Sequence, residues 1–521
     1  MCLTIKPVGK KLPFPTLLIF IALGMLLSVN GPAHIDFNDY ALTETVCSTA
    51  LLFIMFYGGF NTNIDRAKPV AAPAVLLSTL GVVITAGITG VFAHLVLGFD
   101  WIGGLLLGSV VASTDAASVF SVLREHNLSL RDGTDSLLEV ESGSNDPVAY
   151  MLTAVLATLA AGGNIDIPML LAKQIILGVG LGLAIGWASS CLIERAHATA
   201  EGAQTIFLFA VAIVAYALPS YLGGNGFLAV YLAGIVLGAS DITGKVEMAH
   251  FFDTLTEMAE MTIFFLLGLL VTPARLPQML LPGLALMAFM LFVSRPIAVG
   301  ALLAPFKTNP PRQVALISWA GLRGAASVVF SLFAVMAGVP GGHDLFDLVF
   351  VIAVSSIVVQ GSLLPAVAKK LDMIDAEGDV RRTFNDYRDE DGMSFVKLKV
   401  GAGHPFAGRS LADIGSATNM LVVLVLRDGA HPVLPNGDTV IEEGDLLVMA
   451  APTFEERAEV TLREVTVMPH GRLAGQRLRD VPQGKHPFIV VMLKRDGQTI
   501  IPDGNTQIQL GDEAVIATLA S

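Results

Sequence analysis

Residues 141–147, with the sequence ESGSNDP, place two carboxylates, Glu141 and Asp146, within a long apolar run. A carboxylate at membrane depth is costly unless it is paired or reached by water. Ser142 precedes Asp146 by one helical turn and shares its face, and Asn145 adds a neutral amide oxygen. Hard cations prefer such oxygen ligands. Glu141 lies about 140° around the helix from Asp146, so the two acids face different surroundings.

A second group of polar residues lies in two segments that are rich in small residues. The segment STDAAS contains Thr114 and Asp115, and the segment GLRGAAS contains Arg323. Small residues let helices approach closely or break. In broken helices Asp115 could neutralise free N–H groups and Arg323 free carbonyl groups, while the Thr114 carbonyl could ligate a cation. If Asp146 holds either this cation or a proton, but not both, the site exchanges one for the other.

Several of these roles have alternatives. Asp146 could instead be one partner of a structural ion pair, and Asp115 is as well suited to capping a helix as to ligation. We expect Glu141 and Arg323 to form a buried salt bridge, since buried charges are tolerated mainly in pairs. Arg295, in the segment VSRPIAV, is either structural or lines a cytoplasmic funnel.

These segments belong to a strongly apolar chain. Of its 521 residues, 53% are hydrophobic and 15% are charged, against about 25% charged residues in soluble proteins. About twelve apolar stretches are long enough to span a membrane; they lie at 13–30, 41–60, 71–98, 101–122, 136–162, 166–193, 204–221, 225–240, 254–272, 279–305, 312–338 and 346–368. The stretches with Asp115 and Arg323 run in opposite directions, which is typical of inverted repeats with broken helices.

The basic residues between the apolar stretches indicate the orientation of the chain. Apart from Arg275, they fall in one set of alternate loops, such as those with Arg66, Arg131 and Lys307. Cytoplasmic loops carry the excess of Lys and Arg in membrane proteins. We therefore expect both termini to lie in the cytoplasm.

The C-terminal part is polar and contains an internal repeat. Each copy reads G-x-x-L-x-D, an apolar run ending in R-D-G, a P-N-G or P-D-G turn, and a final G-D before another apolar run. We expect a membrane domain at 1–370, a charged linker at 371–385, and two small α+β lobes at 386–453 and 460–521. The acidic composition argues against nucleic-acid binding. Neither copy has a G-x-G-x-x-G after a strand, so a nucleotide-binding lobe is not expected.

The motifs STDAAS, ESGSNDP and GLRGAAS together resemble those of NhaP-type monovalent cation/proton antiporters. With the tail, the chain looks most similar to the potassium/proton branch, the cell-volume regulation antiporters. The two tail copies resemble the C-terminal lobe of RCK domains (the TrkA_C family), which senses ligands. This resemblance implies an all-α polytopic membrane domain of NhaA-like inverted repeats, with broken crossing helices, and small cytoplasmic lobes.

The resemblance also implies residue roles. It implies a cation and proton site made of Asp146, Asn145, Ser142, Thr114 and Asp115. It pairs Glu141 with Arg323, and it associates an Asn–Asp pair with electroneutral exchange. Many members of the family have an acid where this chain has Tyr57, so Asn61 could replace that acid as an auxiliary ligand of the cation. Arg295 is a second candidate for an auxiliary role.

The expected partners follow from the same resemblance. The substrates would be K⁺ or Na⁺, with K⁺ favoured, and H⁺. The protein would be a homodimer in the bilayer of the bacterial inner membrane. No cofactor is expected, although the tail could bind an unidentified regulatory ligand.

Two other classes of function compete with exchange. A cation channel gated by the tail would need a filter such as T-V-G-Y-G, and an intramembrane enzyme would need a motif such as H-E-x-x-H or G-x-S-x-G. Neither kind of motif occurs in this sequence. We therefore expect a secondary antiporter and not an enzyme.

Overall fold

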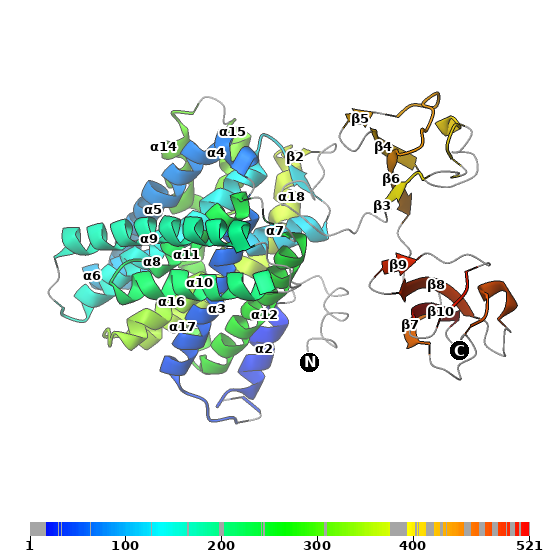
Figure 1. Cartoon of the computed structure of the whole chain (residues 1–521). Coiled ribbons are helices and arrows are strands. Elements are labelled where there is room, and N and C mark those ends of the chain that lie inside the picture. The colour runs from blue at the N-terminus through cyan, green and yellow to red at the C-terminus, as the bar shows by residue number, and fades with distance from the viewer. Residues whose placement is uncertain are drawn as a thin grey trace. The chain divides into compact units, whose positions relative to one another are not determined.

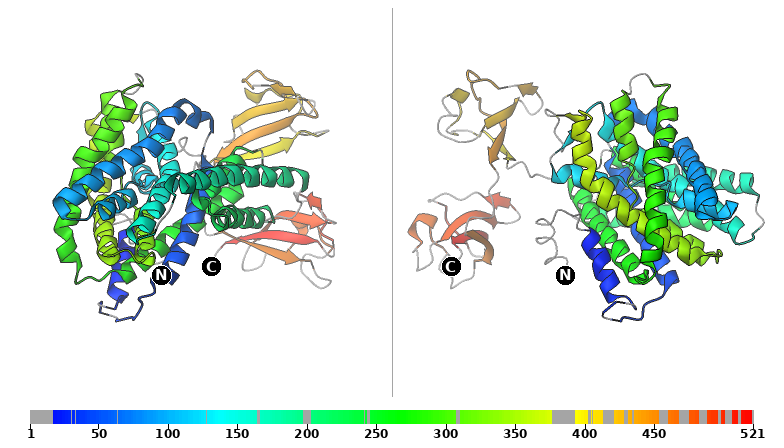
Figure 2. Two further views of the ribbon diagram at one scale, coloured as in Figure 1. Left: turned by 90° about the vertical axis from the view of Figure 1, so that its left-hand side faces the viewer. Right: turned by 180° about the vertical axis from the view of Figure 1, so that it is seen from behind.

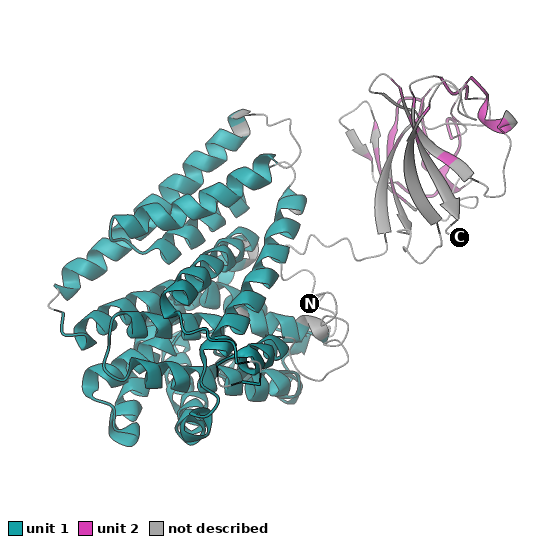
Figure 3. Ribbon diagram, turned by 90° about the horizontal axis from the view of Figure 1, so that it is seen from below, with its two compact units in different colours: residues 1–387 teal, residues 388–521 magenta. Residues whose placement is uncertain are grey.

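The structure is a computed structural model of the chain (Figure 1). It describes residues 17–375 except 30, 33, 63, 127, 164–165, 197–202, 241, 243–244 and 307–309, and residues 393–519 except 402–403, 405, 413–420, 428–430, 434, 453–459, 468–474, 482–487, 496–497, 501–505 and 510–511. The chain divides into two compact units, residues 1–387 and residues 388–521 (Figure 3).

The helices of the first half largely coincide with the apolar stretches predicted from the sequence, although the segment predicted at 71–98 already becomes helical at Ile64. They are α2 (Leu17–Leu27), α3 (Tyr40–Asn61), α4 (Ile64–Leu76), α5 (Val82–Leu97), α6 (Trp101–Val110), α7 (Ala116–Glu125), α8 (Thr134–Ala160) and α9 (Ile167–Ala196). Short acidic side chains begin two of them. Asp39 accepts a hydrogen bond from the N–H of Leu42 at 2.9 Å, and Asp100 from that of Gly103 at 3.2 Å. Such caps satisfy N–H groups that have no partner within the helix.

The helices of the second half again follow the predicted stretches. They are α10 (Ala203–Tyr221), α11 (Gly226–Ala239), α12 (Lys245–Leu270), α13 (Leu276–Phe289), α14 (Arg295–Leu303), α15 (Pro311–Trp319), α16 (Ala325–Met336), α17 (Gly342–Ser356) and α18 (Ser362–Lys370). Six helical segments of the described residues are long and apolar enough to cross a membrane by length and composition. The helical unit is therefore a polytopic membrane domain.

Three short π-helical turns in the described part of the chain join helices into longer segments. They are η1 (Leu77–Gly81) between α4 and α5, η2 (Met290–Ser294) between α13 and α14, and η3 (Ile357–Gly361) between α17 and α18. The first two are related reciprocally, because η1 contacts α14 and η2 contacts α5. The Ser294 hydroxyl of η2 lies 3.0 Å from that of Thr89 in α5. Equivalent turns that contact each other's helices fit the inverted repeat predicted from the sequence.

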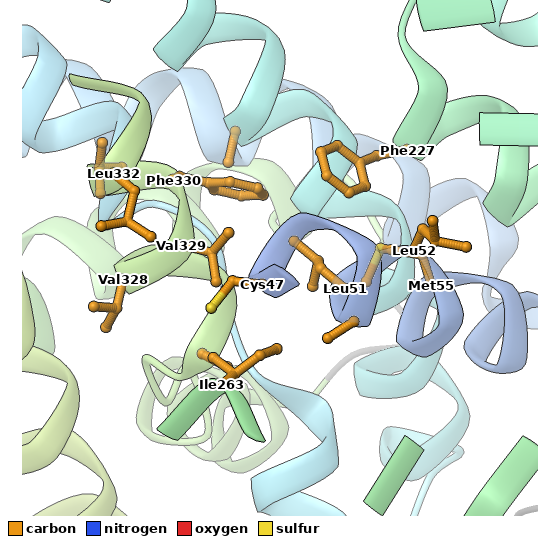
Figure 4. Packing of buried hydrophobic residues seen from close by; sticks show 14 of the residues in the cluster. Cys47, Leu51, Leu52, Met55, Phe227, Ile263, Val328, Val329, Phe330 and Leu332 are labelled. Carbon is orange, nitrogen blue, oxygen red and sulfur yellow. The ribbon is translucent and has the colours of Figure 1, made fainter. Parts of the chain in front are cut away.

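The main core of the helical unit joins helices that are distant in the sequence. Figure 4 shows side chains of α3, α11, α12 and α16 packed together. Cys47 of α3, Phe227 of α11, Ile263 of α12 and Phe330 of α16 are each at most 1% exposed. This packing holds α16 against α3 and so fixes the position of the chain break that precedes α16.

The second unit contains two four-stranded antiparallel sheets (Figure 2). The first has the order β3-β6-β4-β5, from β3 (Met393–Lys399), β6 (Leu446–Pro452), β4 (Leu421–Arg427) and β5 (His431–Val433). The second has the order β7-β10-β8-β9, from β7 (Val460–Thr466), β10 (Glu513–Leu519), β8 (Phe488–Arg495) and β9 (Gln498–Ile500). In chain order both sheets run first, fourth, second, third strand. The sequence repeat is therefore a repeat of topology.

The beginning of the predicted linker is part of the helical unit. Met373 is fully buried, and Ile374–Asp375 form the short strand β2, which pairs with β1 (Ser129–Leu130). The apolar side chains of Met373 and Ile374 explain this packing, because they are shielded from water there. Residues 376–385, the rest of the predicted linker, lie outside the described residues.

Candidate functional site

Helix α8 carries the ESGSNDP motif through the middle of the helical unit. Ser142, Asn145 and Asp146 are all at most 6% exposed, and Asn145 is fully buried. The helix continues without a break past Pro147 to Ala160. The three polar side chains thus occupy fixed positions on a rigid element, deep in the protein.

The two segments rich in small residues are breaks between helices, as the sequence predicts. One break separates α6 from α7 at residues 111–115, and the other separates α15 from α16 at residues 320–324. The breaks contact each other, because the N–H of Asp115 donates to the carbonyl of Leu322 at 2.9 Å. A side chain at Gly324 would overlap the carboxylate of Asp115. Two broken helices therefore meet at this point.

The polar side chains of α8 bind the first break. The Ser142 hydroxyl donates to the Thr114 carbonyl at 2.7 Å, and the Asn145 amide donates to the Thr114 hydroxyl at 2.5 Å. The Ser113 hydroxyl donates to the carboxylate of Asp146. The structure thus gathers the Asp146 carboxylate, three hydroxyl groups, an amide and a main-chain carbonyl. This set is rich in the oxygen atoms that hard cations bind.

Ser113 is a member of this group that the sequence analysis did not assign to the site. It is 2% exposed, and its hydroxyl donates a hydrogen bond to the Asp146 carboxylate. The sequence could have indicated Ser113, because it directly precedes Thr114 in STDAAS and a broken helix presents consecutive residues to the same site.

Asp115 caps the second half of its own broken helix. Its carboxylate accepts from the N–H of Ser118 at 3.1 Å and from the Ser118 hydroxyl at 2.6 Å. An acid at this place also neutralises the partial positive charge of the helix N-terminus. This geometry supports the capping role of Asp115.

The predicted salt bridge between Glu141 and Arg323 is wrong. Glu141 pairs with Arg295 at 2.5 Å, and both side chains are at most 3% exposed. Arg323 instead donates to the carbonyls of Ala112 and Ser113, at 2.8 and 2.7 Å. The reason is geometric: Glu141 faces the junction of η2 and α14, whereas the break with Arg323 lies against the C-terminal end of α6. There Arg323 satisfies free carbonyl groups, as expected for a cation at a broken helix.

The second break is held by a hydrogen-bond network from the end of α17 and from η3. The Ser356 hydroxyl accepts from the N–H of Arg323 at 2.9 Å and donates to Gln360 at 2.5 Å. The Gln360 amide donates to the carbonyl of Trp319 at 3.0 Å. Sequence reasoning missed Gln360, although it is an isolated polar residue in the apolar run SSIVVQGSLL.

A small cavity lies beside this network, between Arg295, Arg323 and Gln360. The cavity has a volume of about 10 Å³ and can therefore hold about one water molecule. The buried Nε of Arg295 has no hydrogen-bond partner in the described part of the chain. A water in this cavity would satisfy it.

The auxiliary residue Asn61 lies at the C-terminal end of α3. Its side chain is 7% exposed, and its Oδ1 has no hydrogen-bond partner within the described residues. The neighbouring Tyr57 donates to Asp253 of α12 at 3.3 Å. No hydrogen bond among the described residues connects Asn61 to Asp146, so its role as a ligand stays a prediction.

Two broken helices thus cross beside a helix that carries buried polar side chains. The same part of the chain, residues 1–370, matches the transmembrane domain of the sodium/hydrogen exchangers. The chain belongs to the sodium/hydrogen exchanger family. Residues 395–453 and 462–521 of this exchanger each match the TrkA-C domain. The family and the tail domains predicted from the motifs are confirmed.

Relatives of this exchanger match most of its length. It is 36% identical over 454 residues to the K(+)/H(+) antiporter NhaP2 of Shewanella sp. (strain MR-4), with 85% of this chain and 78% of the relative covered. It is 34% identical over 446 residues to the K(+)/H(+) antiporter NhaP of Alkalimonas amylolytica, with 83% and 77% covered.

The fold of the exchanger is also similar to a solved structure. The sodium proton antiporter MjNhaP1 from Methanocaldococcus jannaschii superposes with a TM-score of 0.61 at 21% identity. The similarity covers 71% of this chain and 95% of that one. At this identity the comparison supports the fold of the membrane domain alone.

Proposed function

We propose that this exchanger moves a monovalent cation, K⁺ in preference to Na⁺, across a membrane in exchange for H⁺. The observation that carries the proposal is the convergence of Asp146, Ser142 and Asn145 of α8 on Ser113 and Thr114 of the first break. It brings one buried carboxylate together with neutral oxygen ligands. Transport, and not enzyme catalysis, is the activity that such a site performs.

Competition at Asp146 supplies the coupling. With the carboxylate ionised, its negative charge and the surrounding oxygens bind a dehydrated cation. When Asp146 takes up a proton instead, that charge is lost and the cation leaves. A separate pathway for protons is then unnecessary, because each ion displaces the other at the same carboxylate.

The crossing breaks supply alternating access. Asp115 and Arg323 neutralise the helix ends at the crossing, so the helix halves can end next to the ion without a large charge penalty. In inverted-repeat transporters one bundle moves against the other around such a site. This feature favours an antiporter over a tail-gated channel, for which the sequence contains no filter motif.

K⁺ is favoured as substrate because both relatives named above are called K(+)/H(+) antiporters. The charge asymmetry of the loops supports cytoplasmic termini in a bacterial inner membrane. Exchange by a homodimer, with the TrkA-C tail regulating it, completes the proposal.

Proton flux in membrane vesicles tests this function. Addition of K⁺, Na⁺ or Li⁺ should release protons from vesicles with the native chain and not from vesicles with Asp146→Asn, because an amide does not exchange a proton for a cation. Asp135→Asn is the matched control, since it replaces an acid at the start of the same helix and should leave exchange intact.

Three outcomes decide between the possibilities. Unchanged exchange in Asp146→Asn contradicts the site. A larger response to Na⁺ than to K⁺ contradicts the preference for K⁺ only. Cation flux that follows an imposed potential without proton movement indicates a channel.

A further inference from the structure

A pair of short strands ties the loop between the two ion-site helices to the C-terminal end of the membrane domain. Strand β1 lies between α7 and α8, and β2 follows α18; Ser129 opposes Asp375, and Leu130 opposes Ile374. The N–H of Arg131 continues the ladder with a 2.9 Å hydrogen bond to the carbonyl of Met373. The chain leads from β2 toward the TrkA-C lobes.

Charged side chains reinforce this connection. Asp372 binds Arg131 at 3.0 Å and Arg312 at 3.2 Å, and Arg312 also lies 3.7 Å from Asp132. Gln313 of α15 donates to the carbonyl of Asp132 at 3.0 Å. We call residues 129–132, 312–313 and 372–375 the clasp. Exposed ion pairs contribute little one by one, but these share residues and form a network.

The clasp is packed onto the helices that carry the ion site. Met373 is fully buried and Leu130 is 4% exposed, in a cluster with Leu123 of α7 and Leu137 of α8. Helix α7 begins directly after Asp115, and α8 carries Asp146. The clasp therefore packs against α7, which follows the first break, and against α8, which carries Asp146. Closely packed apolar side chains transmit a displacement from one element to the next.

Two residues of the clasp have an unfavourable backbone conformation. Asp132 and Asp372 have φ angles of +60° and +54°, in the left-handed region that non-glycine residues adopt uncommonly. Such conformations persist where surrounding contacts hold them. Here the two residues are the acids that Arg312 joins, so loss of these ion pairs would allow both to leave this region.

We propose that the clasp transmits the state of the TrkA-C tail to the cation site. Tension or ligand-induced movement at the end of β2 would open or displace β1 and, through α7 and α8, change the affinity of the site around Asp146. Arg312 and Gln313 link the same movement to α15, which leads to the second break. This proposal rests on the proposed exchange function, whose regulation it describes.

The test uses the full chain in everted vesicles. A site for a sequence-specific protease, inserted in the predicted linker between residues 380 and 381, releases the tail after folding. Proton flux on addition of K⁺ is measured before and after cleavage. The variants are Asp372→Asn, which removes both ion pairs of Asp372, and Asp344→Asn. Asp344 is a matched control, because it forms an exposed ion pair with Arg275 at 3.3 Å near the start of α17.

We expect cleavage to shift the K⁺ concentration for half-maximal exchange in the chain with its native clasp, by about fivefold or more, the usual lower range of coupling between sites. The same shift should occur in Asp344→Asn and be absent in Asp372→Asn. The proposal is overturned if cleavage has no effect on the native clasp, or if Asp372→Asn responds like the control.

A second variant, in which a disulfide locks the clasp, tests the proposal even if Asp372→Asn misfolds. Ser129→Cys with Asp375→Cys places two thiols opposite each other across β1 and β2, in a chain whose native cysteines are replaced. Oxidised, this chain should exchange ions but ignore cleavage, and a reductant should restore the response. A response to cleavage in the oxidised chain overturns the proposal. Absence of exchange in every chain would instead contradict the proposed function.

Discussion

At the scale of single residues, Asn145 is the neutral neighbour of Asp146, the carboxylate proposed to exchange ions, and both ends of the Asn145 amide form hydrogen bonds. The Nδ2 group donates to the Thr114 hydroxyl at 2.5 Å, and Oδ1 accepts from the Thr114 N–H at 3.4 Å. Asn145 thus fastens α8 to the first break without adding charge. In the proposed mechanism one acid, Asp146, then alternates between cation and proton, and this fits the electroneutral exchange expected from the sequence.

Asn145→Asp should make exchange sensitive to membrane potential. A second carboxylate at the site allows a second proton to be carried, so that each cycle moves a net charge, and one charge adds about 2.3 kcal/mol of driving force per 100 mV. Exchange rates measured at imposed potentials check this. Asn145→Ser, which keeps the site neutral, should remain insensitive; equal behaviour of the two variants would contradict the proposed role of Asn145.

Glu141 illustrates how a charge near the site can serve the structure. Its pair with Arg295 is almost fully buried. Removing one partner of such a pair usually destabilises a protein by about 3–5 kcal/mol, because the other charge is left uncompensated. The pair of Glu141 with Arg295 joins α8 to α14. Arg323 instead binds the main-chain carbonyls that follow α6.

At the scale of elements, the site depends on how closely two broken helices meet. Asp115 begins α7, Arg323 contacts the end of α6, and Gly324 lies where any side chain would overlap the Asp115 carboxylate. Glycine is therefore required at residue 324 for the approach of the two breaks.

Gly324→Ala should reduce exchange by at least about tenfold while the protein still inserts and folds, since a displacement of about 1 Å can cost about a hundredfold in a positioned site. Proton flux at saturating K⁺, with the amount of folded protein measured by size-exclusion chromatography, checks this. Gly87→Ala is the control, because a methyl group there meets no atom within 4 Å. Equal loss in both variants would show that the close approach is unimportant.

At the scale of the whole molecule, the tail repeats one stabilising arrangement in both lobes. Arg427 binds Asp445 at 3.0 Å, and Arg495 binds Asp512 at 2.7 Å; both aspartates are 1% exposed. Each aspartate also accepts from a main-chain N–H at 2.8 Å. These residues come from the repeated R-D-G and G-D motifs, so the repeat preserves an ion pair to a buried aspartate as well as a strand order.

This arrangement gives the tail a defined pH dependence. Hydrogen bonds from Arg495 and the N–H of Gln509 hold the pKa of Asp512 below its ordinary value. Burial raises the pKa of Asp445, but Arg427 and the N–H of Glu442 outweigh it and lower the net value. A lowered pKa stabilises the fold fully above the unfolded value of about 3.9, and this stability is lost as the pH falls below it.

Residues 388–521 should therefore melt at lower temperatures as the pH is lowered from 5 to 3 (about one unit to either side of the unfolded pKa). Asp512→Asn should lower the free energy of unfolding at pH 7 by about 2 kcal/mol and weaken the pH dependence. Circular dichroism melts across this range check both. The exposed Asp438→Asn serves as control; a pH dependence in Asp512→Asn as steep as in the native tail would contradict the assignment.

Much of this protein could be predicted from the sequence alone. The apolar stretches require helices because lipid offers main-chain groups no other partners, and the small residues around Asp115 and Arg323 predicted two breaks. Helical spacing placed Ser142 on the face of Asp146. These are local properties, set by composition and by the period of a helix.

The tertiary structure decided which charges meet. Spacing showed that Glu141 faces away from Asp146, but not that it faces Arg295 instead of Arg323, because the depth and rotation of α8 and α14 depend on packing along their whole length. The contact of Ser113 with Asp146 and the clasp joining β1 to β2 also connect residues far apart in the chain. Such contacts depend on how complete helices pack against one another, which local spacing does not contain.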